Sequence, residues 1–339
     1  MQQRIATLAA LLLFGLIAWW GVTRQQVAPE DADAGRVSFQ IATGPSGGTF
    51  FTLGQAIAGL ISHPRGAARC ETSTVCAPSG LILSARTAQG SPDNLRAVNA
   101  GLVDSALVQA DMVETAVRGQ GAFRRDGPLR NIAVIAALFP EEVHLVVAPR
   151  SGITALRGLS RKRVWLAPAG TDAGDTARGI LAGLRISVLA VAGDDPEKLM
   201  RDGAVDAFFV MAAAPYGPVT QVLERDKARL VPIQGAAVER LLRLQPQLQD
   251  AVIPAEAYRG WPQIHTIGTR TLWVVNRRAP DALVYGITRA LFNPANREAL
   301  SGSHPSAHKI ALGSAALELP VGIHPGAARY YREVGVLAR

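Results

Sequence analysis

The most constraining feature of this chain is a nine-residue pattern that occurs twice, about a hundred residues apart. Both copies, 100–108 and 202–210, end a predicted helix and continue with a glycine, an apolar pair, an aspartate and an apolar run. Each copy follows a predicted strand, a loop rich in small and hydroxyl residues, and a helix start. This order predicts an α/β fold of two similar lobes with mostly parallel sheets, and a cleft between the lobes that closes on a small polar ligand.

Composition limits the class of protein. A length of 339 residues favours two domains, and 48% hydrophobic against 18% charged residues fits a globular chain. The net charge of +8 would suit anionic partners, but the basic residues are scattered, and their longest cluster is 161–163. Because the sequence has no basic stripe with interleaved aromatic residues, we predict a solvated basic surface and no nucleic-acid partner.

The N-terminus has the pattern of an export segment. A basic residue precedes an apolar run over 5–22, which is short for a transmembrane helix but carries a tryptophan pair suited to a membrane interface. The best small-x-small cleavage site, 32–34, lies far from this run. We therefore predict a signal peptide or a membrane anchor over 1–26 and a linker over 27–35. Both a cleaved signal and a retained anchor remain open, and the predicted location is the periplasm.

Cys70 and Cys76 are the only cysteines, and they enclose five residues. In an oxidising compartment they are expected to form a disulfide. A zinc site is disfavoured because His63 is the nearest histidine in sequence and such a site needs four ligands.

Periodicity in apolar residues places the secondary structure. Predicted strands cover 37–43, 81–87, 105–109, 131–138, 143–148, 163–166, 187–191, 207–210, 230–233 and 271–275. Predicted helices begin near Thr49 and cover 91–100, 176–184, 196–201, 236–244 and 280–292. The chain is expected to cross between lobes at 139–142 and to return near 271–275. Lobe I is then 36–147 plus 266–339, and lobe II is 148–265.

The loop after the first strand is the sharpest candidate site. Its glycines let backbone N–H groups approach a ligand, and the following helix adds partial positive charge, which suits a carboxylate or phosphate. The loop matches neither a Walker loop nor the dinucleotide fingerprint, and a simple tight turn is the alternative. The ligand-binding candidates in this segment are Thr43, Gly44, Ser46, Gly47, Gly48, Thr49 and Phe50.

A second loop in lobe II offers Gly170, Thr171 and Thr176, with a helix N-cap as the alternative role. Asp172 disfavours an anion there unless it faces away or binds an ammonium group of the ligand.

Three further polar residues complete the candidate set. Gln109 follows a buried strand, Asp111 is expected to hold a cation or cap the next helix, and Glu141 lies at the predicted crossing. His144 is expected to be a hydrogen-bonded core residue. The sequence contains no recognisable hydrolase set and no metal-ligand spacing, which favours binding over turnover.

Five segments in this order resemble the TAXI class of solute-binding proteins, which serve tripartite ATP-independent periplasmic (TRAP) transporters. They are 41–51, 108–111, 138–144, 202–215 and 324–331, and the similarity covers about residues 36–337. The first segment is similar to a family segment with Gly-Gly-Thr-Tyr-Tyr, in which Phe50 here replaces a tyrosine. Where the family has Gly-Ser-Gly-Thr, this chain has Gly-Thr-Asp-Ala at 170–173.

The resemblance implies a two-lobed periplasmic-binding-protein type II-like fold without catalytic role or cofactor. Such a protein delivers a small anionic or zwitterionic solute to TRAP permease membrane subunits, and an ion gradient drives the import. By motif, the ligand-cleft residues become Gly47, Gly48, Thr49, Phe50, Gln109, Asp111 and Glu141. Two alternatives stay open: a membrane-anchored extracytoplasmic ligand sensor with the same cleft, and an enzyme on the same scaffold.

Overall fold

The computed structural model describes residues 37–67, 70, 75–246 and 248–338. The predicted export segment and linker lie outside these described residues. Within the described ranges, no helix is long and apolar enough to cross a membrane.

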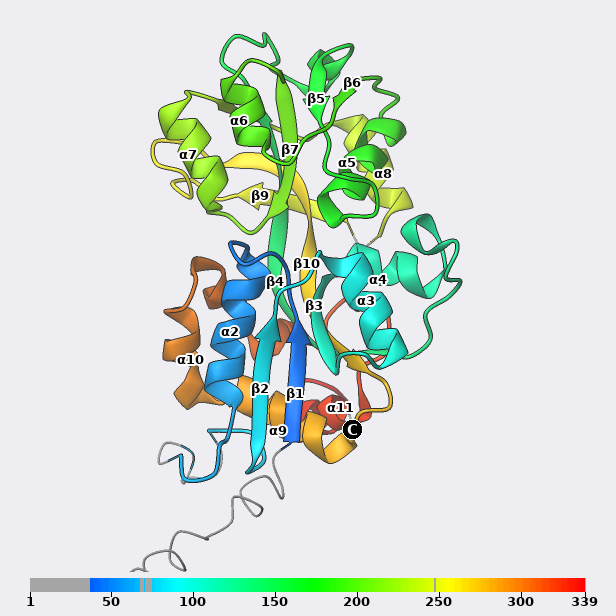
Figure 1. The fold of residues 1–339 in the computed structure, drawn as a ribbon, viewed down its shortest axis with the longest axis vertical. Helices are drawn as coiled ribbons and strands as arrows, with labels where there is room; N and C mark the ends of the chain where they lie inside the picture. Colours follow the sequence, from blue (N-terminus) through cyan, green and yellow to red (C-terminus); the bar gives the residue numbers. More distant parts are fainter. Residues whose placement is uncertain (1–36, 68–69, 71–74, 247, 339) are drawn as a thin grey trace, which may run out of the picture. The chain divides into compact units, whose positions relative to one another are not determined.

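A single mixed sheet and the helices packed on it make up the fold (Figure 1). The strands are β1 (Val37–Ala42), β2 (Leu81–Arg86), β3 (Ser105–Gln109), β4 (Ile132–Val147), β5 (Arg163–Trp165), β6 (Leu189–Val191), β7 (Ala207–Ala212), β8 (Arg229–Val231), β9 (Gln249–Ile253) and β10 (Ile264–Asn276). The helices are α2 (Thr49–Ile61), α3 (Ser91–Ala100), α4 (Ala110–Val117), α5 (Asp172–Gly183), α6 (Pro196–Arg201), α7 (Gly217–Arg225), α8 (Ala236–Leu244), α9 (Asp281–Leu291), α10 (Pro294–Ser301) and α11 (Pro325–Glu333).

The strand order is β2-β1-β3-β10-β4-β7-β5-β6, with β8 paired to β4 and β9 to β10. Within the first lobe β1 and β3 are parallel, and within the second lobe β5 is parallel to both β6 and β7. The long strands β4 and β10 are antiparallel to their neighbours and run through both lobes (Figure 1). The predicted two-lobed α/β fold is confirmed, and the two long antiparallel strands are an addition to it.

Helices cover both faces of the sheet in each lobe. Successive residues of a strand point to opposite faces and therefore pack against different helices. On β1, Ile41 packs in a core cluster with α2, α9 and α11, whereas Ala42 packs in a cluster with α3 and α4. On β7, Phe209 packs with α5 and α8, whereas Phe208 packs with α7. Both lobes therefore have three layers, with the sheet in the middle.

The crossing between the lobes differs from the prediction. The expected strands 131–138 and 143–148 are one continuous strand, β4, of 16 residues. Pro140, which has no N–H group to donate, lies inside it opposite Arg270, and the pairing of β10 with β4 shifts register between Arg270 and Leu272. The core clusters change between Phe139 and Val143 along this strand. The lobe boundaries at 147/148 and 265/266 stay a prediction.

The sequence repeat has a matching structure in the two lobes. Gly101 after α3 and Gly203 after α6 both have left-handed φ angles, 73° and 72°, which a glycine adopts without strain. In both copies the next N–H group bonds back into the helix, from Leu102 to Ala97 and from Ala204 to Leu199. The same helix-ending turn therefore leads into β3 and into β7.

The repeated aspartate also has the same role in both lobes. The Oδ2 atom of Asp104 accepts a hydrogen bond from the Gln40 N–H of β1 at 2.8 Å, and that of Asp206 accepts one from the Arg163 N–H of β5 at 2.9 Å. Each aspartate thus joins the start of one strand to its parallel neighbour.

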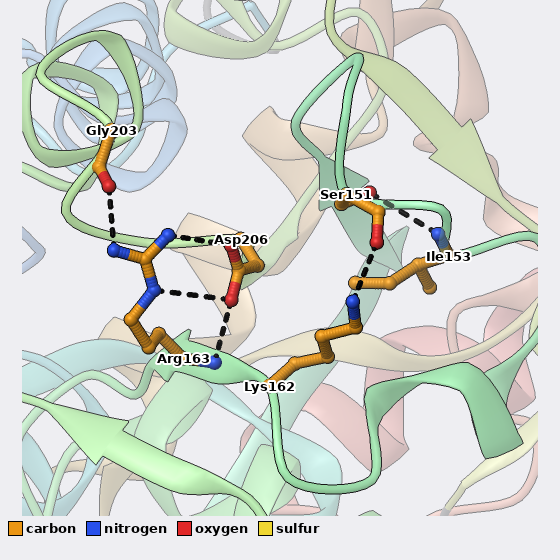
Figure 2. A network of polar contacts seen from close by, with 6 residues as sticks. All are labelled: Ser151, Ile153, Lys162, Arg163, Gly203 and Asp206. Carbon is orange, nitrogen blue, oxygen red and sulfur yellow. Dashed lines mark hydrogen bonds and ion pairs between the residues drawn. The ribbon is translucent and has the colours of Figure 1, made fainter.

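The second copy is reinforced by a local network (Figure 2). The Arg163 guanidinium donates to both carboxylate oxygens of Asp206 and to the Gly203 carbonyl, while Lys162 donates to the Ser151 carbonyl. Hydrogen bonds from Arg163 lower the pKa of Asp206. The network fixes the amino end of β5 and lies apart from the cavities described below.

The predicted disulfide is present, since Cys70 and Cys76 are bonded with their Cα atoms 5.4 Å apart. Both cysteines are buried. The Asn296 side chain of α10 donates to the carbonyl of Val75, the residue before Cys76, and so holds Val75 against the first lobe.

Candidate functional site

A cavity of about 550 Å³ lies where β4 passes from the first lobe to the second. Its volume is typical of small-molecule sites. Residues of both lobes line it, and eight of them belong to the predicted site: Gly44, Gly47, Gly48, Thr49, Phe50, Gln109, Glu141 and Thr171.

The position follows from the topology. The parallel strands of each lobe end at the same edge of the sheet, and the loops after them converge there. The loop after β1 supplies the glycines, β3 ends at Gln109, and β5 ends at Trp165. Glu141 reaches the cavity from the middle of β4.

Gln109 and Glu141 form a buried polar pair in the first lobe. The Gln109 Nε2 atom donates to the Glu141 Oε2 atom at 2.7 Å, and the two side chains are 2% and 3% exposed. The backbone N–H of Gln109 donates to the Ser91 hydroxyl, which fixes the end of β3. The Gln109 Oε1 atom is buried and has no hydrogen-bond partner within the described chain.

The first loop turns tightly before α2. The Gly48 N–H donates to the Pro45 carbonyl, and Gly48 is the N-cap of α2, so no side chain caps this helix. Thr43 is fully buried, donates to the Arg86 carbonyl and is not among the residues that line the cavity. Ser46 is exposed and does not line the cavity.

The second loop acts mainly as a helix start. The Thr171 hydroxyl accepts from the Gly174 N–H and donates to the Pro168 carbonyl, so it is the N-cap of α5. A Cβ atom at Gly174 would overlap the Pro168 carbonyl oxygen, which explains the glycine in the first turn. The helix begins at Asp172, four residues before the predicted start, because this cap ends the loop earlier.

Three predicted site residues lie elsewhere. Asp111, Gly170 and Thr176 line a second cavity of about 560 Å³. The Thr176 hydroxyl of α5 donates to the Asp111 Oδ2 atom of α4 at 3.3 Å, which links the two lobes. Burial raises the pKa of Asp111 to about 6, against the opposing hydrogen bonds from Thr269 and Thr176. The expected capping role of Asp111 was wrong, because α4 begins at Ala110 and Gln109 is its N-cap.

The second lobe contributes residues to the cavity that were not predicted from the sequence: Trp165, Asp194, Glu197, Phe209 and Tyr216. The Trp165 indole donates to the Gly193 carbonyl at 2.8 Å, which fixes its ring. Burial and the negative charges of Glu197 and Glu141 raise the pKa of Tyr216. Trp165 is the last residue of β5, and the others lie in β7 or in segments that follow β6 and β7, so position after a strand was the available signal.

A series of hydrogen bonds connects the Tyr216 backbone to the core. Its N–H donates to the Tyr258 hydroxyl, and the hydroxyl lies 2.8 Å from the His144 Nε2 atom. The His144 Nδ1 atom lies 2.9 Å from the Glu142 carbonyl oxygen. Burial lowers the pKa of His144 to about 4, so the ring is neutral, and its Nε2 atom accepts a hydrogen bond from the Tyr258 hydroxyl. The prediction of a hydrogen-bonded core histidine is confirmed.

The cavity surface is acidic and aromatic. Among the described residues, its lining includes three carboxylates and no Lys, Arg or His. The described ranges also contain no cluster of three or more acidic, His or Cys residues that could hold a metal ion. The lining has hydrogen-bonding groups and ring faces but lacks a Ser–His or Cys–His pair within the described chain, an arrangement suited to holding a small molecule.

The two lobes, the strands that connect them and the cavity at the strand ends define a two-lobed α/β fold of the periplasmic-binding-protein type. Residues 41–335 match the NMT1-like family, and the chain belongs to that family.

Several solved structures are similar to this chain. MatC from Rhodopseudomonas palustris with bound malate has a TM-score of 0.50 and 14% identity, over 88% of this chain and 96% of that chain. The alkanesulfonate-binding protein SsuA from Xanthomonas axonopodis pv. citri bound to MOPS has a TM-score of 0.44 and 13% identity, over 88% and 80%. A putative L-cystine ABC transporter from Listeria monocytogenes has a TM-score of 0.46 and 12% identity, over 80% of this chain and 99% of that chain.

Proposed function

We propose that this protein is the extracytoplasmic solute-binding subunit of a membrane transporter and that it captures a small organic acid or amino acid. The observation that carries the proposal is a cavity of about 550 Å³ lined by both lobes at the strand ends. A ligand that contacts both lobes stabilises the closed arrangement and shifts the open–closed equilibrium. Membership in the NMT1-like family supports this role.

The transporter is proposed to be of the TRAP type, with the chain as its TAXI-class subunit. This part rests on the five sequence segments that resemble TAXI proteins, including 41–51 and 138–144. The N-terminal apolar run supports export to the periplasm, as a cleaved signal or an anchor in the inner membrane. A disulfide between Cys70 and Cys76 fits an oxidising compartment.

No catalytic role is proposed. The groups that face the cavity, such as Gln109, Glu141 and Tyr216, can bind and orient a solute. MatC, which has the same fold, binds malate, a small organic acid.

The test is binding by the protein stripped of ligand by unfolding and refolding. A compound at about 100 times its Kd should stabilise the protein by roughly 2.7 kcal/mol and raise its melting temperature by some degrees. The compound should be recovered unchanged, and small-angle scattering should show a smaller radius of gyration on binding. Chemical conversion of the compound would contradict the proposal in favour of an enzyme.

Transport requires a second assay. With the cognate permease in vesicles, uptake of the solute should need this protein and an ion gradient but no ATP. Uptake driven by ATP would contradict the TRAP assignment and keep the binding role. Ligand binding that supports no uptake with any transporter but changes a signalling partner would favour the sensor.

A further inference from the structure

The lining of the cleft cavity has the wrong charge for a simple anion. Glu141 from the first lobe and Asp194 and Glu197 from the second contribute carboxylates, and within the described chain no Lys, Arg or His lines the cavity. Arg178, which lies behind the second loop, donates to the Ala167 carbonyl and is not part of the lining. An anion placed among these carboxylates would be repelled, whereas a cation would be attracted.

The buried polar pair offers acceptors rather than donors. The Gln109 side chain uses its Nε2 atom on Glu141 at 2.7 Å, so the amide orientation is set by the carboxylate. Its Oε1 atom is left buried without a partner, at a side chain that is 2% exposed and lines the cavity. A buried acceptor without a partner destabilises the folded protein unless a ligand or water donates to it. The ligand group that fits this place is therefore an N–H or O–H donor.

The charge of the cavity favours a positively charged N–H donor over a neutral O–H donor. Glu141 is 3% exposed, so its carboxylate acts in a region with little water, where charge interactions are strong. Glu141 of the first lobe and Glu197 of the second line the same cavity as Tyr216, and both charges add to burial in raising the pKa of its hydroxyl. A positively charged donor gains from this field, and a neutral hydroxyl gains much less.

Aromatic rings complete the environment. Trp165 and Tyr216 from the second lobe and Phe50 from the first line the same cavity. The Trp165 ring is fixed by the hydrogen bond from its indole to the Gly193 carbonyl at 2.8 Å. Ring faces attract organic cations and bury the hydrocarbon part of the same ligand.

We propose that the cleft selects solutes with a protonated amine, which is held by Glu141 and the Gln109 Oε1 atom and flanked by the aromatic residues of the second lobe. The inference rests on the proposed solute-binding function and narrows it to cationic or zwitterionic ligands. A carboxylate on the ligand is an accessory group and is placed at the N-terminus of α2, where Gly48 leaves the first turn without a side-chain cap.

The test compares compounds of equal length that differ in charge. Putrescine, γ-aminobutyrate and succinate share a four-carbon chain with two, one and no amines, and longer and aromatic amine–acid pairs extend the series. Binding to the refolded full chain is measured by thermal melting and calorimetry. We expect amines and amino acids to bind at least tenfold more tightly than the matched acids without an amine.

Variants locate the amine. Glu141→Gln removes the buried charge and should weaken amine binding at least tenfold, and Glu197→Gln, at a half-buried position, should weaken it severalfold. Glu224→Gln is the matched control, because Glu224 is exposed and does not line this cavity. Glu197→Gln keeps the proposal testable if Glu141→Gln does not fold.

Two results would overturn the inference in different ways. Acids without an amine that bind as tightly as amines, with unchanged or tighter binding to Glu141→Gln and Glu197→Gln, would refute selection for an amine and leave the solute-binding role intact. Failure of every compound to bind the folded protein would refute both the inference and the solute-binding role.

Discussion

Replacement of Asp111 by asparagine should stabilise the protein at neutral pH. The Asp111 carboxyl lies at the contact between α4 and α5, where it accepts a hydrogen bond from Thr176, and its Oδ1 atom is buried without a hydrogen-bond partner. Burial raises its pKa from 3.8 to about 6. The folded protein therefore holds this proton more tightly than the unfolded chain, and ionisation of the carboxyl destabilises the fold.

The magnitude follows from the two pKa values. The contribution of the protonated Asp111 carboxyl to the free energy of unfolding is complete below pH 3.8 and is lost as the pH rises through about 6. Between these pH values the folded state binds more protons than the unfolded state. At 1.36 kcal/mol for each pH unit between the two values, the loss reaches about 3 kcal/mol above pH 7 and only about 0.5 kcal/mol at pH 4. An asparagine keeps an acceptor for Thr176 and has no charge, so it resembles the protonated acid.

Urea denaturation at pH 4, 5, 6 and 7.5 measures this directly. The free energy of unfolding of Asp111→Asn should exceed that of the wild type by an amount that grows with pH to about 3 kcal/mol. Glu142 and His144 titrate in both proteins, so the difference isolates Asp111. Asp250→Asn, at an exposed position of β9, is the control and should change little. A difference that is absent or independent of pH would refute the reasoning.

Three further predictions concern stability. Tyr258→Phe removes the donor to the buried His144 Nε2 atom and should lower the free energy of unfolding by about 1 to 3 kcal/mol in urea. Replacement of Cys70 and Cys76 together by alanine should cost about 2 kcal/mol, because the bond closes a loop with a sequence separation of 6; a thiol reductant should reproduce the loss in the wild type only. Asp206→Asn should lower the free energy of unfolding by about 1 kcal/mol near pH 7, because the lowered pKa means that the ionised carboxylate stabilises the fold above pH 3.8. The unfolding free energies of the variant and the wild type should converge in acid, where the carboxylate is protonated.

The repeated pattern predicted the fold because its signals are local. A glycine with a left-handed φ ends α3 and follows α6, and an aspartate then ties β3 or β7 to its parallel neighbour. Helices 91–100, 196–201 and 236–244 were predicted with their observed limits. In contrast α7, α10, α11 and β9 were missed. Each has at most nine residues, which leaves few positions in which an apolar period can be recognised, although α6, with six residues, was predicted.

The site was predictable only in part, for a physical reason. Glycines before a helix and polar residues at strand ends are visible in the sequence, and Gly48, Gln109 and Glu141 line the cavity as a result. The strands β4 and β10 place the two lobes, and this arrangement decides which side chains of the second lobe reach the cavity. No local pattern of apolar residues determines that arrangement. Trp165 and Tyr216 were therefore identified as cavity residues only from the structure.

Buried polar atoms without a hydrogen-bond partner occur both in the core and at the cavities of the described chain. In the core, the His144 ring nitrogens are hydrogen-bonded, whereas the Asn94 amide donates to two buried carbonyls and its Oδ1 atom has no partner. At the cavities, the Gln109 Oε1 and Asp111 Oδ1 atoms are buried without a partner, at about 1 to 3 kcal/mol for each such group. What distinguishes Gln109 and Asp111 is that each lines a cavity. Under the proposed function, a ligand that donates to the Gln109 Oε1 atom would satisfy this acceptor and add a contact that the empty fold lacks.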